Sequence, residues 1–149
     1  MVYETRETAR SGARYFALIL GIIYTLVGIL GFIPGLVQQA ANNPPLTVDT
    51  LYGNLLGIFP VNILHTLVHL AVGLWGIFAY RSYSASRTYA RTIGIVFLVL
   101  FLFGLIPGLN TVFGLIPLFG ADIWLHLVTA LLGLYFGFSG RSEAGEPAV

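Results

Sequence analysis

The sequence predicts an all-α membrane protein with four transmembrane helices, arranged as two tandem helical hairpins of the same orientation. Three observations carry this prediction. The chain of 149 residues is 57% hydrophobic and 9% charged, which is not the composition of a soluble domain. It contains four long apolar segments, and its two halves repeat each other. We therefore expect a single four-helix transmembrane domain over residues 1–149.

The apolar segments define the expected helices in chain order. A helix that spans a bilayer needs about 20 mostly apolar residues, and each segment is of this size. The basic residues before the first segment are also typical of a signal peptide. This segment has a repeat partner deep in the chain, however, which argues against cleavage. The four predicted spans are Ala13 to Ile33, Pro60 to Tyr80, Thr88 to Ile106 and Pro117 to Phe138.

The long first connection is expected to hold a short amphipathic helix on the outer surface. Thr47 is suited to cap its start, and Pro44–Pro45 blocks a helix before it. The polar first ten residues predict a short surface helix. Residues 139–149, rich in Gly, Ser, Glu and Pro, predict a flexible tail. The apolar positions at helical spacing in the connection are Val48, Leu51, Tyr52, Leu55 and Leu56.

The distribution of arginine predicts the orientation. All seven basic residues are Arg, and they lie before the first span, in or beside the connection between spans two and three, or after span four. The two other connections contain none. By the positive-inside rule, both termini are then cytoplasmic. The residues are Arg6, Arg10, Arg14, Arg81, Arg87, Arg91 and Arg141.

An internal repeat relates the two halves, with repeat one at about residues 13–80 and repeat two at about 87–138. Arg14 to Leu36 matches Arg87 to Leu109 at an offset of 73 residues, and Pro60 to Gly76 matches Pro117 to Gly133 at an offset of 57. Chance explains apolar matches but poorly explains co-registered Arg, Gly, Pro and His. Repeats of two spans each insert in the same orientation, which predicts a pseudo-twofold axis along the membrane normal.

Three histidines and one aspartate form the candidate site. His65 and His69 are spaced i, i+4, and so are Asp122 and His126, so each pair shares one helix face. Each pair begins five residues after a Pro that is expected in the first helical turn, which places the cluster in the outer part of the membrane. Polar side chains inside a bilayer are expensive, so we expect these four to face inward and to lie close together.

This residue set leaves three kinds of chemistry open. His65, His69, Asp122 and His126 are plausible ligands for a divalent metal such as zinc. The same residues also suit a hydrogen-bonded or proton-conducting network that holds the helices together. A haem or chlorophyll is the third alternative. His69 and His126 are then the symmetric axial pair, because two His residues at i, i+4 lie on one side of a macrocycle.

Other functional signals are absent from the sequence. There is no phosphate-binding Gly loop, nucleophile elbow or HExxH motif, and no catalytic residue is assigned. The chain has no Cys, and its net charge of +1 does not indicate nucleic acid as a partner. We therefore expect a structural or accessory subunit of a larger membrane complex rather than an enzyme. A zinc-type metal-binding protein or hydrolase and a haem- or chlorophyll-binding subunit are the alternatives.

The motifs at these positions resemble a bacterial four-helix membrane family known as domain of unknown function 4383. The resemblance covers nearly all of Ala13 to Phe138. It implies a multi-pass protein of a bacterial-type cell membrane or an internal membrane, and it assigns no activity or cofactor. The segments that carry it are Gly31-Phe32-Ile33-Pro34-Gly35, Leu64-His65-Thr66-Leu67-Val68-His69-Leu70 with Gly73, and Asp122-Ile123-Trp124-Leu125-His126-Leu127.

Overall fold

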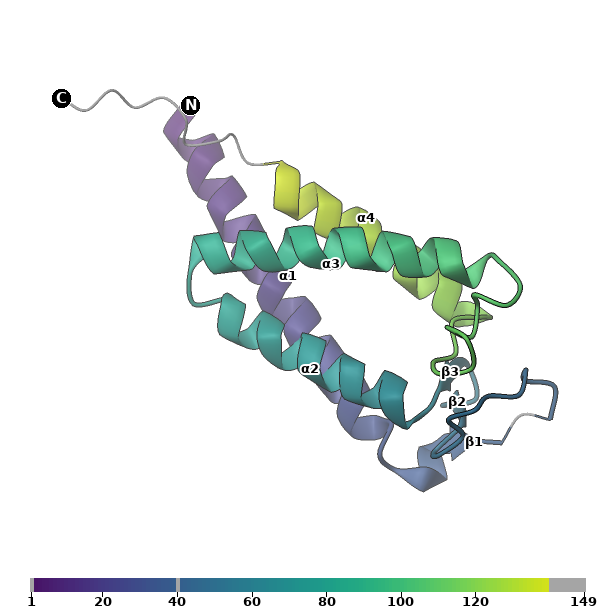
Figure 1. Cartoon of the computed structure of the whole chain (residues 1–149). Coiled ribbons are helices and arrows are strands. Elements are labelled where there is room, and N and C mark those ends of the chain that lie inside the picture. Colours follow the sequence, from purple (N-terminus) through teal and green to yellow (C-terminus); the bar gives the residue numbers. More distant parts are fainter. Residues whose placement is uncertain (1, 40, 140–149) are drawn as a thin grey trace.

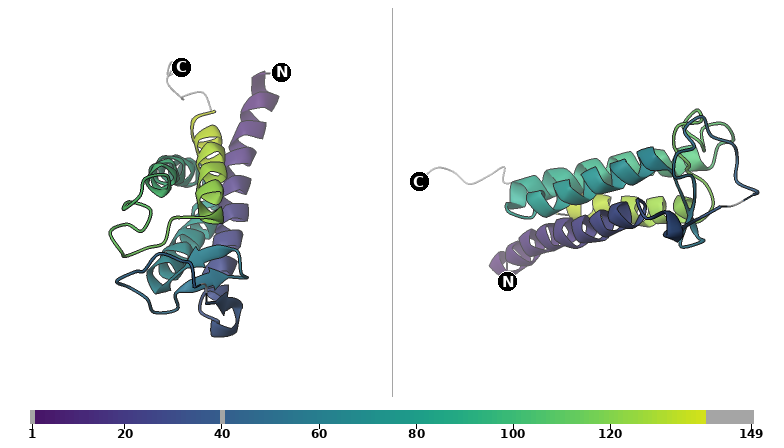
Figure 2. Two further views of the ribbon diagram at one scale, coloured as in Figure 1. Left: turned by 90° about the vertical axis from the view of Figure 1, so that its right-hand side faces the viewer. Right: turned by 90° about the horizontal axis from the view of Figure 1, so that it is seen from below.

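Four helices form most of the described chain, which comprises residues 2–39 and 41–139 of this computed structural model. The start of α1, the turn between α2 and α3, and the end of α4 lie at one end of the molecule, and the two longer connections lie at the other (Figures 1 and 2). The predicted helical class is confirmed. The helices are α1 (Val2–Leu30), α2 (Ile63–Ala79), α3 (Tyr83–Gly104) and α4 (Ala121–Phe138).

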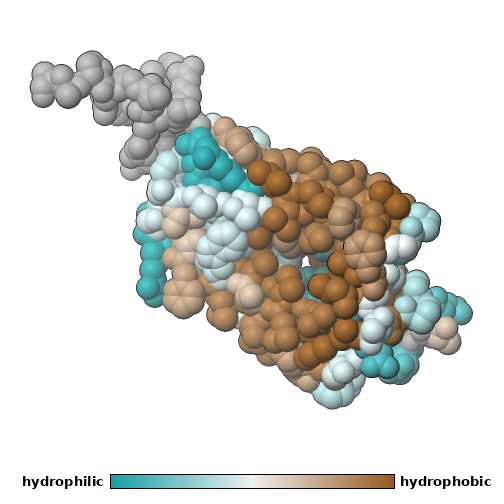
Figure 3. All heavy atoms as spheres, viewed as in Figure 1, coloured by the Kyte–Doolittle hydropathy of each residue, from teal (hydrophilic) through white to brown (hydrophobic). Residues whose placement is uncertain are grey.

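Within the described residues, α1, α3 and α4 are long and apolar enough to cross a membrane. In α1 this apolar stretch is Gly12–Leu30, and α2 is apolar but shorter, with 17 residues. Large apolar side chains such as Ile19, Val99 and Trp124 point outward, and they give the helices a largely hydrophobic surface (Figure 3). An apolar surface of this extent is typical of contact with lipid.

Glycines allow close contact within each sequential helix pair, because α1 packs mainly on α2, and α3 on α4. A Cβ atom built on Gly76 would lie 2.9 Å from the Cα atom of Gly21. A Cβ atom built on Gly133 would lie 2.7 Å from the Cα atom of Gly94. Side chains larger than hydrogen do not fit between these backbones without displacing a helix. Small residues play this part in membrane helix packing generally.

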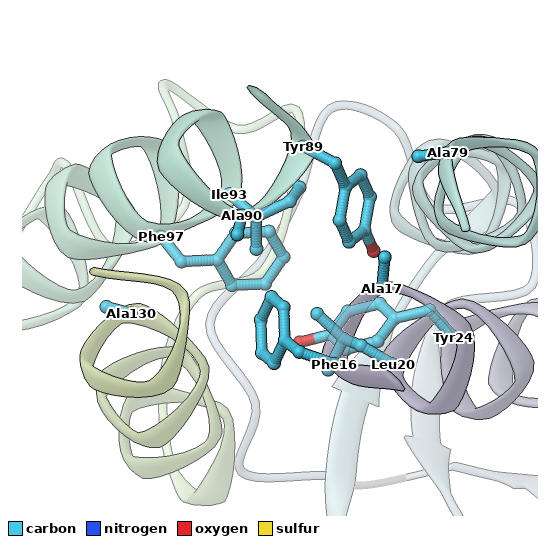
Figure 4. Close-up of a cluster of buried hydrophobic side chains, with 10 residues drawn as sticks. All are labelled: Phe16, Ala17, Leu20, Tyr24, Ala79, Tyr89, Ala90, Ile93, Phe97 and Ala130. Carbon is cyan, nitrogen blue, oxygen red and sulfur yellow. The ribbon is translucent and has the colours of Figure 1, made fainter. Parts of the chain in front are cut away.

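Aromatic rings join the two helix pairs in the centre, where α1 meets α3. The ring centroids of Phe16 and Tyr89 are 6.3 Å apart, and those of Tyr24 and Phe97 are 5.5 Å apart. These rings belong to a buried cluster drawn from all four helices (Figure 4). Its members are Phe16, Ala17, Leu20, Tyr24, Ala79, Tyr89, Ala90, Ile93, Phe97 and Ala130.

Arginine side chains satisfy carbonyl groups at the ends of α2 and α4. Arg14 donates from Nε to the Tyr80 carbonyl oxygen at 2.9 Å. Arg87 and Arg91 donate from Nε to the Gly137 carbonyl oxygen at 3.0 and 2.8 Å. The last carbonyls of a helix have no partner within the helix and carry partial negative charge, so cations bind there favourably.

The first long connection contains a small sheet, so the predicted amphipathic helix is wrong. After a 3-10 turn, η1 (Pro34–Leu36), the antiparallel strands β1 (Val37–Gln38), β2 (Gly53–Leu55) and β3 (Phe59–Val61) pair in that order. The φ angles of Leu51 and Leu56 are 53° and 54°, which an α-helix excludes. The Thr47 and Val48 amides both donate to the Gly114 carbonyl oxygen, so Thr47 does not cap a helix.

Three helix boundaries differ from the prediction. Neither proline lies in a first helical turn: Pro60 lies in β3, opposite Asn54, and Pro117 precedes α4. Their helices therefore begin later, at Ile63 and Ala121. At the other end, α1 runs unbroken from Val2, so the separate N-terminal surface helix is wrong; no Gly or Pro interrupts the chain before Gly12. The predicted tail, apart from Ser139, lies outside the described residues.

Candidate metal centre

The first two turns of α2 and α4 position the candidate site. His65 is the third residue of α2 and Asp122 is the second residue of α4, and each helix adds a histidine one turn later. At about 1.5 Å of rise per residue, the whole cluster lies within about 9 Å of the helix starts. It is therefore closer to the two longer connections than the predicted proline positions implied.

The start of α2 is set by Asn62. Its Oδ1 atom accepts a hydrogen bond from the His65 amide at 3.0 Å, which makes Asn62 the N-cap. Its Nδ2 atom donates to the carbonyl oxygens of Val48 at 2.8 Å and Leu115 at 2.6 Å. One buried side chain therefore ties both longer connections to the turn that carries His65. Asn62 therefore both caps α2 and links the two connections.

All four predicted site residues are buried, with exposed fractions of 1–3%. The Oδ2 atom of Asp122 lies 3.4 Å from Nε2 of His126 and 3.9 Å from Nε2 of His65. Each of these three residues offers one ligand atom, and the three atoms all lie within 4.8 Å of one another. The structure therefore brings together His65, Asp122 and His126.

The distances within this group resemble those between ligands of one ion. Ligand atoms about 2.0–2.2 Å from a tetrahedral zinc ion lie roughly 3.3–3.6 Å from each other. The Asp122–His126 separation of 3.4 Å falls in that range, and the His65–Asp122 separation of 3.9 Å is slightly longer. A charged hydrogen bond between such groups is shorter, about 2.7–2.9 Å. Nitrogen and carboxylate donors of this kind suit zinc.

His69 stands beside this group rather than within it. Its ring centroid is 4.3 Å from that of His65, and its ring also packs against Tyr24, with centroids 5.1 Å apart and planes at 79°. His126 packs in the same way against Phe97, with centroids 5.0 Å apart. The cluster is therefore walled by two aromatic rings, one from α1 and one from α3.

Several buried polar atoms of the cluster have no hydrogen-bond partner among the described residues. Buried polar groups in folded proteins are nearly always paired, because leaving one unpaired costs about 1–3 kcal/mol. Six such atoms lie together in this cluster. They are Nδ1 of His65, both ring nitrogens of His69, both carboxylate oxygens of Asp122, and Nδ1 of His126.

Tyr24 is a further residue at the site whose role was not predicted. Its hydroxyl group lies 2.9 Å from Oγ1 of Thr129 and forms a buried hydrogen bond between α1 and α4. The sequence showed Tyr24 only as an isolated polar position. The repeat holds the relevant signal, because Tyr24 matches Phe97 at the same offset that aligns the first spans.

Comparison with known families finds one whose model matches most of the chain. The family model described as Domain of unknown function (DUF4383) matches residues 14–139. The chain belongs to this family. No curated protein and no solved structure matches the chain. The DUF4383 match includes all four helices from Arg14 onward and all four candidate site residues, and it assigns no activity to them.

Proposed function

We propose that this DUF4383 protein is a membrane protein that binds one divalent transition metal ion, such as zinc, through His65, Asp122 and His126. The observation that carries the proposal is the convergence of three ligand atoms inside a cluster with six unpaired buried polar atoms. A bound ion would satisfy the three convergent residues at once. The donors are imidazole and carboxylate groups, and the chain has no Cys, which favours zinc over metals that select thiolates.

A polar network without metal is the second candidate, and it corresponds to a purely structural role for the cluster. The 3.4 Å separation between Asp122 and His126 supports it, because a small rotation would allow a hydrogen bond. Such a network would still leave both ring nitrogens of His69 to be satisfied. The three-ligand metal centre leaves these nitrogens unpaired as well, so the metal is preferred for the convergence of the three ligand atoms and not for His69.

A macrocycle on His69 and His126 receives less support from the packing. Each of these imidazoles has an aromatic ring at its edge, Tyr24 in one case and Phe97 in the other. Tyr24 and Phe97 also contact each other, with centroids 5.5 Å apart. A haem or chlorophyll between the two histidines would need the space that these rings fill. An ion needs no such space.

The framework that we propose for this centre has four spans, built as a duplicated hairpin. Contacts between positions that match in the repeat support the duplication, because the same contact occurs in both halves. Residues aligned with each other also meet in the middle, as beside a twofold axis; His65 and Asp122 are one such pair. The matched contacts are Arg14–Tyr80 with Arg87–Gly137, Gly21–Gly76 with Gly94–Gly133, and Tyr24–His69 with Phe97–His126.

In this framework the protein acts as a metal-containing structural or accessory subunit of a bacterial-type membrane complex, with cytoplasmic termini. The large apolar side chains on the outer faces of the helices are available to lipid and to neighbouring subunits. The metal would lie beneath the two outer connections, in the outer part of the membrane.

Metal analysis of the detergent-purified full-length protein tests the proposal. We expect about one zinc ion per chain after equilibration with a slight excess of zinc and removal of free metal. His126→Ala and Asp122→Ala should abolish stoichiometric binding, because each leaves only two of the three convergent ligands. Gln38→Ala, in β1 and exposed, is the control and should retain the metal.

A second control lies within the helix that carries two of the histidines. Thr66→Val changes a buried polar residue next to His65 while keeping its shape, so it should also retain the metal. Size-exclusion profiles establish which variants remain folded. A folded wild-type protein that binds no zinc, cobalt or other divalent metal would reject the metal centre in favour of the polar network.

A further inference from the structure

His69 is the residue of the cluster that the three-ligand centre does not use. Its exposed fraction is 3%, and neither of its ring nitrogens has a hydrogen-bond partner within the described chain. A neutral imidazole carries one donor and one acceptor nitrogen. Burying both without partners is costly, so a polar group that belongs to this site must meet them.

Tyr24 packs against the His69 ring, as His65 does. The Tyr24 ring packs at 79° to the His69 ring, and the Tyr24 hydroxyl is bonded to Thr129 on α4. The His69 ring therefore contacts both the ring of His65 and a tyrosine anchored to α4. This arrangement places His69 next to the centre and outside the group of three converging ligand atoms.

Three protein ligands leave one position of a tetrahedral ion free. Closed structural zinc sites have four protein ligands, whereas sites with three keep the fourth position for water or an exchangeable molecule. The group that would occupy this position here is polar and small, because the cluster is buried and walled by aromatic rings. Figure 3 shows a small patch of hydrophilic residues within an otherwise largely apolar face.

We propose that the fourth position of the centre takes an exchangeable water molecule, hydroxide or small inorganic anion, and that His69 binds this ligand by a hydrogen bond. The proposal rests on the metal centre proposed above. It assigns different roles to the two histidines of α2: His65 binds the metal, and His69 is a positioning residue that contacts only the exogenous ligand. It also gives one of the two unpaired ring nitrogens of His69 a partner.

The test uses the full-length protein in detergent with cobalt(II) in place of zinc and azide as the exogenous ligand. Cobalt(II) absorbs visible light in a way that depends on its ligands, so azide binding changes the spectrum. We expect the wild-type protein to bind one cobalt ion and to give a saturable change with azide. His69→Ala should keep the cobalt ion and bind azide about tenfold more weakly or worse, the effect expected for loss of one hydrogen bond to a charged group.

Two further variants separate the hydrogen bond from general disturbance of the site. His69→Gln retains a donor and an acceptor and should recover part of the azide affinity. Leu67→Ala changes a lipid-facing residue of the same helix, two positions away, and should leave both cobalt and azide binding unchanged. A merely structural role for His69 would instead alter the folded fraction without selectively weakening azide.

Each contrary outcome overturns a definite part of the inference. If folded His69→Ala or His69→Gln loses cobalt as His126→Ala does, then His69 is a fourth metal ligand. If the wild-type protein binds cobalt but shows no spectral change with azide, the centre is closed, and the metal proposal stands without this ligand. If the folded wild-type protein binds no metal at all, the proposed function fails first, and metal analysis alone establishes that.

Discussion

At the scale of single residues, Asn62 joins the first turn of α2, which carries His65, to the two longer connections. It is fully buried, and its side-chain amide makes three hydrogen bonds. It accepts one from the His65 amide and donates one to a carbonyl oxygen in each of the two longer connections. The matching position in the second repeat is Phe119, which has no such group. The N-cap of α4 is instead Gly120, which makes no side-chain hydrogen bond to the helix. A side chain that links a helix start to both connections is therefore present in only one half.

Asn62→Ala should destabilise the protein more than loss of an ordinary helix cap does. An N-cap substitution costs about 0.5–2 kcal/mol. Here it also leaves the Val48 and Leu115 carbonyl oxygens without their donor, at about 1–3 kcal/mol for a buried group. Ser82→Ala is the matched control, because Ser82 caps α3 through one exposed hydrogen bond. Unfolding in detergent, followed by circular dichroism, should show a clearly larger loss for Asn62→Ala; equal losses would contradict this role.

At the scale of elements, the fold depends on close backbone contact within each hairpin. Gly76 meets α1 at Gly21, and Gly133 meets α3 at Gly94, with no room for a Cβ atom in either place. These contacts occur at positions that match in the repeat. A duplicated hairpin predicts that both contacts contribute similarly to the free energy of unfolding. Chance similarity between apolar segments predicts no such relation.

Gly76→Ala and Gly133→Ala should each lower the free energy of unfolding by about 1–3 kcal/mol, the usual cost of overpacking a tight contact. The two losses should be similar. Gly35→Ala is the control, because no described atom lies within 4 Å of the added Cβ atom and its φ angle is not positive. Chemical unfolding of the three variants measures the difference. A large loss for one substitution with none for the other would argue against equivalent hairpins.

At the scale of the whole molecule, the sequence predicted those features that depend on the bilayer and on helix periodicity. The apolar segments indicated the positions of the helices, since a bilayer allows few alternatives to a helix. The first connection was not predictable in this way. Its leucines have helical spacing, but Leu55 is buried through strand pairing with Val37, which is distant in sequence. Local periodicity cannot report such a contact, nor the positive φ angles of Leu51 and Leu56.

The same limit applies to the site. The i, i+4 spacing of each pair and the repeat together predicted that His65, His69, Asp122 and His126 lie close together and face inward. They could not predict that His69 stands beside the other three, because that depends on the Tyr24 ring. Tyr24 is held by Thr129, a contact between residues 105 positions apart in the chain. Sequence patterns therefore locate the cluster, and tertiary packing assigns the separate positions within it.

The orientation of the whole molecule gives the last prediction. The end that holds the start of α1, the α2–α3 turn and the end of α4 also holds Arg14, Arg81, Arg87 and Arg91, and three of these bind helix carbonyls there. Basic residues are retained on the cytoplasmic side. The chain has no Cys, so a cysteine introduced at one position is labelled without background. Ser84, at the basic end, and Asn42, in the connection between α1 and α2, are both exposed.

In intact cells, a maleimide that does not cross membranes should label Asn42→Cys and should not label Ser84→Cys. Disruption of the cells should expose both, which confirms that each thiol is reactive. Only α2 lies between these positions in the chain, so they lie on opposite sides only if α2 crosses the bilayer, and the shorter helix is tested together with the orientation. Labelling of both positions in intact cells would mean that α2 does not span, and the reverse pattern would place the basic end, and with it both termini, outside. The proposed metal centre would then lie near the inner surface, in contact with the cytoplasmic metal pool.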